Sequence, residues 1–199
     1  MTYAQLYDSI QNLPLHICRD VVKKNVLSFT GVNSVKIFKT RHFTPDICRG
    51  VYLSPRSEKH FIQATMGRHV IMVAANQNRC WDRLIVVKEL MHLLDGDEES
   101  VDTGNDFDRL LSELFIGPGS DSKTNSEFIA FWRALGMLAP EKLRQSEKLI
   151  WTEAKKNGSI SADYEAALKF KIPQAYISFL FSERYEHELS RILDRKLSI

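Results

Sequence analysis

The spacing of hydrophobic residues predicts two helices at the N-terminus, followed by strands. Apolar side chains recur at helical spacing over residues 2–12 and 15–28. Pro14 separates these two segments and Gly31 follows the second, so each segment is followed by a residue that favours a helix end. Between residues 32 and 76 the apolar positions take a period of two instead, which predicts three or four strands.

The period changes again after the strands. The last strand is the nearly continuous apolar run at residues 70–75, and we expect a turn at residues 66–68 to join it to the strand before it. From Cys80 to Leu94 the apolar residues return to helical spacing, which predicts a helix. The polar, turn-rich residues 95–105 predict a solvated loop.

The rest of the chain has the pattern of a helical protein. A helix is expected to begin near Asp106 and to end at Gly117, and residues 120–126 are the best candidate for a boundary loop. Further helices are expected near residues 126–138, 140–157, 161–170 and 174–194. Six aromatic residues are expected to build their core: Phe128, Phe131, Trp132, Trp151, Tyr164 and Phe170.

These elements predict an α+β fold. We expect a small, mainly antiparallel sheet packed on the helix at residues 80–94, within a domain of residues 1–119. Residues 120–199 are expected to form a helical C-terminal section that packs on this domain. A chain of 199 residues is long enough to bury such a core.

Composition excludes several classes of function. The net charge is +2, from 27 basic and 25 acidic residues, so the chain has no general attraction to nucleic acid or to an anionic membrane. The N-terminus lacks the pattern of a signal peptide, and no run approaches the ~18 apolar residues of a membrane span, so we expect a cytoplasmic protein. The three cysteines, Cys18, Cys48 and Cys80, include no C-x-x-C pair and predict buried free thiols.

The helix at residues 80–94 carries the most informative motif. Lys88-Glu89-Leu90-Met91-His92 is the zinc-peptidase motif H-E-x-x-H with lysine in place of the first histidine. In that motif the two imidazoles hold zinc, while the glutamate deprotonates a zinc-bound water. Lys88 and His92 share one helix face, and Glu89 lies about 100° around the helix from Lys88. His92 is therefore the candidate metal ligand and Glu89 the candidate base.

The chain resembles the ImmA/IrrE family of metallopeptidases over roughly residues 60–180. In that family the helix reads approximately R-F-T-L-A-H-E-L-G-H, where residues 83–92 read R-L-I-V-V-K-E-L-M-H. The family segment E-x-A-N-x-F-A-A-E-L-L-M-P aligns with residues 106–118, so the resemblance puts Asp106 at the third zinc ligand. Residues 170–176 resemble the family's turn between two late helices.

The resemblance implies a zincin-like fold, zinc peptidase chemistry and a repressor-type transcription regulator as the partner. Two of its ligand positions are altered, because Lys88 replaces a histidine and Asp106 replaces a glutamate. A protonated lysine has no lone pair to give to zinc. No cofactor is therefore favoured, and zinc is an alternative only if another side chain such as His60, His69 or Asp108 moves in as a ligand.

Two of the motif residues have an ordinary structural interpretation besides the chemical one. Glu89 could be a helix-surface carboxylate that pairs with Arg83 or Lys88. His92 could be a half-buried imidazole hydrogen-bonded to a neighbouring carboxylate. A further hypothesis is that the Lys88 ammonium stands in for the metal among Glu89, Asp106 and Asp108.

The favoured function is that of a pseudoenzyme. It would act by protein binding in the regulation of phage, mobile-element or stress genes. One alternative is an active metallo-endopeptidase that uses His92, Asp106 and a replacement ligand, with Glu89 as the base. The other is a nucleic-acid-binding regulator that uses the helix, tight turn and helix predicted over residues 162–180. Such an outline more often reflects ordinary helix packing than DNA binding, so nucleic acid is not the favoured partner.

Overall fold

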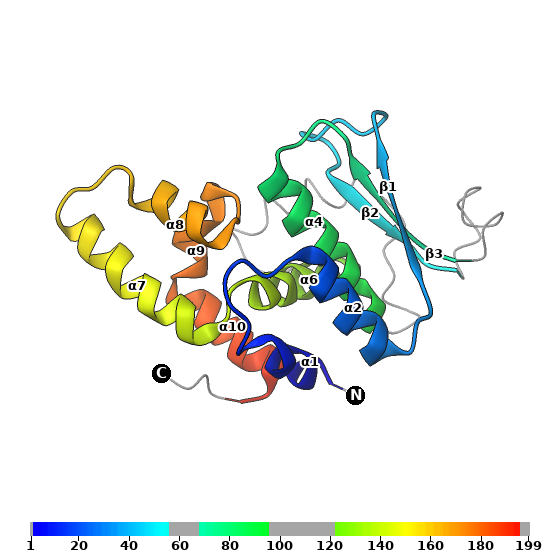
Figure 1. Ribbon diagram of the computed structural model, residues 1–199, viewed down its shortest axis with the longest axis horizontal. Helices are drawn as coiled ribbons and strands as arrows, with labels where there is room; N and C mark the ends of the chain where they lie inside the picture. The colour runs from blue at the N-terminus through cyan, green and yellow to red at the C-terminus, as the bar shows by residue number, and fades with distance from the viewer. Residues whose placement is uncertain (1, 56–67, 96–121, 196–199) are drawn as a thin grey trace.

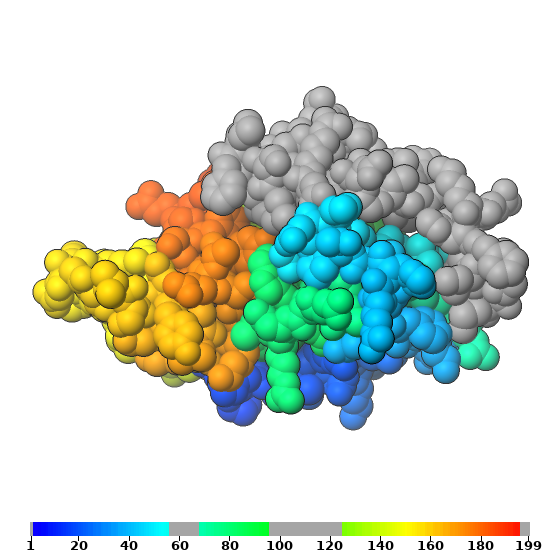
Figure 2. Space-filling model, turned by 90° about the horizontal axis from the view of Figure 1, so that it is seen from above, coloured from blue at the N-terminus to red at the C-terminus, as the bar shows by residue number. Residues whose placement is uncertain are grey.

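The structure is a computed structural model that describes residues 2–55, 68–95 and 122–195, with the backbone alone at residues 122–124. It has the expected α+β architecture: a small sheet lies against one helix, and the other helices gather on the opposite side of that helix (Figure 1). Seen from above, the far end of helix α7 (Glu141–Lys156), in yellow, projects from the body of the molecule (Figure 2). None of the helices in the described ranges has the length and apolar character needed to cross a lipid bilayer.

The sheet contains three strands in the order β1-β3-β2. These are β1 (Val35–Thr40), β2 (Gly50–Leu53) and β3 (His69–Ala74). β2 pairs with β3 antiparallel, but β1 pairs with β3 in parallel, so the expectation of a mainly antiparallel sheet was wrong. The most continuously apolar strand, β3, takes the central place, where its backbone is bonded on both edges, and it runs in the same direction as β1.

Helix α4 (Arg79–Met91) forms the centre of the fold. Asn78 caps it by accepting hydrogen bonds from the backbone N–H groups of Cys80 and Trp81. The helix contacts the sheet on one side and helices α2 and α6 on others, so every residue from Leu84 to Met91 is buried. A short 3-10 helix, η1 (His92–Leu94), extends it.

Gly50 lets β2 approach α4 closely. A Cβ atom at this position would lie 2.4 Å from Ile85 Cγ2, which is closer than two carbon atoms can pack. The sheet therefore lies directly on the helix that carries the motif.

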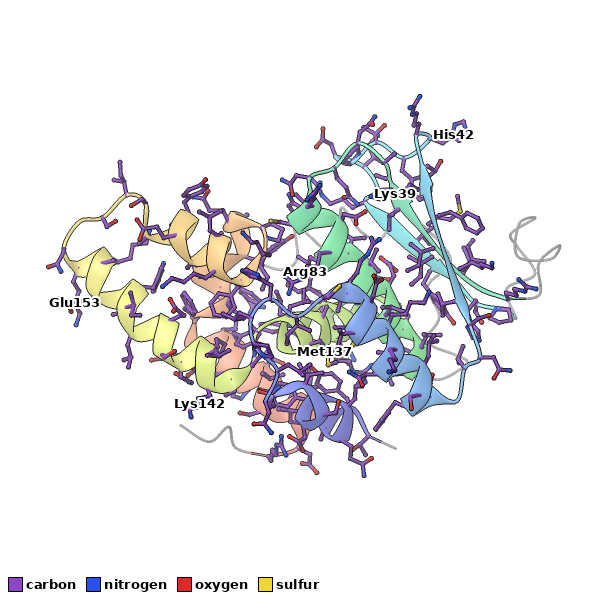
Figure 3. All side chains as sticks on the ribbon, in the orientation of Figure 1. Lys39, His42, Arg83, Met137, Lys142 and Glu153 are labelled. Carbon is purple, nitrogen blue, oxygen red and sulfur yellow. The ribbon has the colours of Figure 1, made fainter. Side chains whose placement is uncertain are left out.

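Helix α6 (Ser122–Leu138) packs along α4, and most of its residues from 125 to 138 are buried. Met137, on its C-terminal half, lies in the middle of the molecule (Figure 3). The other helices surround this pair: α1 (Tyr3–Ile10), α2 (Arg19–Thr30), α7, α8 (Ala162–Phe170), η2 (Gln174–Tyr176), α9 (Ile177–Leu180) and α10 (Glu183–Leu193). As expected, Gly31 ends α2, in a left-handed conformation with φ of 72°.

Three details of the helical section differ from expectation. Residues 122–126 belong to α6 rather than to a boundary loop, and Ser126 at the end of this segment is buried. Residues 174–194 form three short helices rather than one. Tyr164 is 54% exposed and lies outside the core. The turn expected at residues 66–68 and the helix expected from Asp106 lie largely or wholly outside the described residues.

Arg83 ties two distant parts of the chain to α4. Its Nε donates a hydrogen bond to the carbonyl oxygen of Ile17 at 2.9 Å. Its Nη1 donates to the carbonyl oxygens of Phe170 and Lys171 at 2.6 and 2.9 Å. Figure 3 shows Arg83 between α4 and the C-terminal helices, where burial lowers its pKa to about 10. The residue that precedes the motif is thus a structural anchor.

Candidate functional site

The last turns of α4 and the early turns of α6 bring four ionisable side chains together in the interior. Lys88, Glu89, His92 and Glu127 are between 1% and 5% exposed. The first three come from the motif, and Glu127 comes from α6. Buried charges are costly unless they are paired, so their arrangement shows what stabilises them.

The Lys88 ammonium lies between two carboxylates. Its Nζ is 3.0 Å from Glu89 Oε1 and forms an ion pair with Glu127 Oε2. Burial by itself would lower the pKa of Lys88, but Glu127 and Glu89 outweigh burial and hold the pKa above its ordinary value. Lys88 is therefore fully protonated at neutral pH.

Glu127 links Lys88 to His92. Its Oε1 is 3.2 Å from His92 Nε2, while its Oε2 pairs with Lys88. Burial opposes ionisation of Glu127, yet the two neighbouring cations hold its pKa well below its ordinary value. Glu89 completes a ring of four groups, because its Oε2 is 3.8 Å from His92 Nε2.

The other ring nitrogen of His92 is held by Asp95. Nδ1 lies 2.8 Å from Asp95 Oδ2, and Ser126 Oγ donates a hydrogen bond to the same oxygen at 2.7 Å. Arg133 Nη1 donates to Asp95 Oδ1 at 2.8 Å. Burial would lower the pKa of His92, but Glu127 and Asp95 raise it to about 9, so the imidazole is protonated at neutral pH. Nδ1 donates a hydrogen bond to Asp95, while Nε2 is in ion contact with Glu127.

Opposite charges balance within this group. Three cations face three anions, and together they form what we call the ion cluster: Lys88, His92, Arg133, Glu89, Glu127 and Asp95. Each carboxylate pairs with at least one cation: Glu89 and Glu127 with Lys88, and Asp95 with His92 and Arg133. The cluster is thus electrically neutral when His92 is protonated, which is the condition under which buried ions are tolerated.

Tyr52 of β2 covers the cluster on the sheet side. Its ring stacks on the His92 ring with 6.1 Å between centroids and an interplanar angle of 13°. The Tyr52 hydroxyl is 2.6 Å from His69 Nδ1. His69, one of the residues that could have replaced a missing zinc ligand, is thus engaged with Tyr52.

The described residues of the site do not fit a catalytic zinc ion. Such an ion needs three protein donors with free lone pairs and an open water position. The Lys88 ammonium, which has no lone pair, contacts the two carboxylates, and His92 is already paired with Asp95 through Nδ1 and with Glu127 through Nε2. No group of three or more His, Cys, Asp or Glu side chains in the described ranges is arranged to hold a metal ion. Asp106, His60 and Asp108, the other candidates, lie outside these ranges.

Three interpretations of the polar residues were wrong in part. Glu89 pairs with Lys88 as one interpretation held, but it is buried rather than on the helix surface. The sequence predicts a solvated loop at Asp95, yet the side chain of Asp95 is only 3% exposed because it bonds His92, Ser126 and Arg133. The interpretation of His92 agrees with the geometry in its hydrogen bond to a carboxylate, but the imidazole is buried rather than half-buried.

Glu127 is the site residue that sequence reasoning missed. The sequence resemblance places residues 106–118 on the ImmA/IrrE segment that begins with a ligand glutamate, and puts Asp106 at the position of that glutamate. Helix α6 offers the same outline, since Glu127 lies near its start and Pro140 follows its end. A search for a glutamate on the next long apolar helix that ends before a proline would have found it.

The helix, turn and helix expected over residues 162–180 form α8, η2 and α9. α8 is followed by Lys171 in a left-handed conformation and then by η2 and α9, the latter only four residues long. Ile177 and Leu180 of α9 are fully buried. At four residues this second helix is about one turn long, which is short for a recognition helix in a DNA groove.

Comparisons with known proteins add no assignment: no family model, no curated protein and no solved structure matches this chain.

Replacing Lys88 with methionine should test whether the ammonium stabilises the cluster. Lys88→Met keeps the apolar stem but leaves Glu89 and Glu127 without their shared cation, so we expect a loss of about 3–5 kcal/mol in the free energy of unfolding, measured by urea denaturation. Adding Glu127→Gln should recover part of it. Lys142→Met, on the exposed surface of α7 (Figure 3), should change stability by less than about 0.5 kcal/mol. A loss in Lys88→Met no larger than in this control would contradict the role of the ammonium.

The raised pKa of His92 predicts how stability depends on pH. Because its pKa is about 9 in the folded protein against an ordinary 6.5, its contribution is complete below the ordinary value and is lost as pH rises through 9. The stability difference between wild type and His92→Gln should therefore be larger near neutral pH than at alkaline pH, by up to about 3 kcal/mol. Urea titrations at several pH values measure this difference, and parallel curves for the two proteins would refute the prediction.

Proposed function

We propose that this protein is an ImmA/IrrE-like pseudo-peptidase that acts by binding a protein partner. The partner class that the resemblance implies is a repressor-type transcription regulator of phage, mobile-element or stress genes. The protein would bind this regulator without hydrolysing it. The resemblance supports the family and the partner, while the ion cluster supports the loss of chemistry.

The observation that carries the loss of catalysis is the position of the Lys88 ammonium. It contacts Glu89, the residue that would act as base, and Glu127, the carboxylate that would be a third ligand. A general base must be able to accept a proton from water, but Glu89 is buried and already pairs with a cation. The cluster is thus arranged to neutralise itself rather than to activate a water molecule.

Restoring the histidine of the motif tests this explanation. In Lys88→His the new imidazole would join His92 and Glu127 as a third donor, so bound zinc should rise from near zero to about one ion per chain after incubation and dialysis. Elemental analysis by mass spectrometry measures the zinc content. Adding Glu127→Gln to this variant should lower it again, and Lys142→His should match wild type.

Two results would count against the proposal. Near-stoichiometric zinc in the wild-type protein, with proteolysis that disappears in Glu89→Gln, would favour the active metallopeptidase. If Lys88→His gained no zinc, the hypothesis that His92 and Glu127 are still placed to bind a metal would be wrong.

Binding of the partner needs a separate test. We expect a repressor-type regulator co-expressed with this protein to elute with it in size-exclusion chromatography and to keep its intact mass. Glu89→Gln should leave both results unchanged, because the proposed function needs no base. Cleavage of the regulator by wild type but not by Glu89→Gln would contradict the proposal, as would the absence of a complex with any regulator of this class.

A further inference from the structure

The outer edge of β1 is a second surface with distinctive chemistry. β1 lies at the end of the sheet, and no other strand in the described ranges pairs with its outer edge (Figure 1). An unpaired edge presents a row of backbone N–H and C=O groups that can accept an added strand. At six residues β1 is long enough to do so.

The two edges of the sheet are not equivalent. The other edge strand, β2, has four residues, and Gly50, Tyr52 and Leu53 are buried beside α4. In β1, by contrast, Lys36, Phe38 and Lys39 are exposed. The longer and more accessible edge is therefore β1.

The charge along β1 has a single sign. Lys36, Lys39 and Arg41 occur between residues 33 and 45, a stretch that contains no acidic residue. Lys39 is paired with Asp82 of α4 at 2.8 Å, whereas Lys36 and Arg41 form no ion pair with any described residue. Lys39 and His42 mark the same end of the strand in Figure 3. The free charges at this edge thus favour a negatively charged ligand.

An exposed aromatic residue lies among these charges. Phe38 is 40% exposed. Lysines alone would suffice to keep a strand edge from aggregating, so protection of the edge does not explain an exposed aromatic ring. Neither a proline nor a bulge interrupts the register of β1 with β3. The edge therefore combines backbone groups, an apolar contact and positive charge, which are the elements of recognition by strand addition.

We infer that the outer edge of β1 binds an extended, acidic segment of a protein partner as an added strand. Backbone hydrogen bonds to β1 would provide affinity, and carboxylates of the segment would pair with Lys36 and Arg41. The inference rests on the proposed function in one respect, that the partner is a protein. It adds the binding surface and the chemistry of the segment.

A synthetic peptide tests the inference without the natural partner. The probe is a fluorescein-labelled peptide of alternating Glu and Val, and its affinity is measured by fluorescence anisotropy on the full chain. We expect the double variant Lys36→Glu, Arg41→Glu to weaken binding about tenfold, as two lost ion pairs of roughly 0.7 kcal/mol each would do. The matched control Lys142→Glu, Lys156→Glu on α7 should bind like wild type.

Two further probes separate strand addition from simple charge attraction. Methylating alternate backbone nitrogens of the peptide, on the residues whose N–H groups face β1, removes donors but keeps the charge, so binding should be lost. A peptide with Lys in place of Glu should not bind. Unchanged binding of the methylated peptide, or tighter binding of an oligo-dT strand than of the acidic peptide, would overturn the inference.

The natural complex distinguishes failure of this inference from failure of the proposed function. If a repressor-type regulator binds wild type and the Lys36→Glu, Arg41→Glu variant equally well, the β1 surface is wrong and the proposed function stands. If no regulator binds wild type while the peptides behave as expected, the proposed function fails and the β1 surface stands.

Discussion

The ion contact between Lys88 and Glu127 is the interaction on which the centre of this molecule depends. It joins α4 to α6 in the part of the core where both helices are buried, and neither charge has access to water. An isolated ion in such a place would be destabilising by several kcal/mol, so each of the two requires the other. Glu89 and His92 close the ring, and Asp95 with Arg133 extends it toward the surface.

The surrounding fold explains why these ions are buried. α4 lies between the sheet and α6, and the missing side chain of Gly50 lets β2 approach it. A helix enclosed on both sides has no solvent face on which a lysine could reach water. The ammonium of Lys88 is therefore confined to its carboxylate partners, which explains how the core tolerates a buried cation at this position.

The functional proposals follow from two different parts of the same α4 and sheet unit. The interior face of the unit holds the self-neutralised cluster, which supports binding without hydrolysis. Its outer edge, β1, carries unpaired backbone groups and free positive charges. The two proposals are independent in this respect, because strand addition at the β1 edge does not involve the charges of the cluster.

The sequence alone determined the α+β class, the three described strands and the helix that carries Lys88, Glu89 and His92. Local periodicity and capping residues such as Asn78 and Gly31 are enough for these elements. Only the tertiary structure decided that β1 runs parallel to β3, that Asp95 is buried, and that Glu127 faces Lys88 from a helix 39 positions further along the chain. Strand order and ion pairing depend on contacts between distant segments, and the pattern of one segment does not specify which partner it will meet.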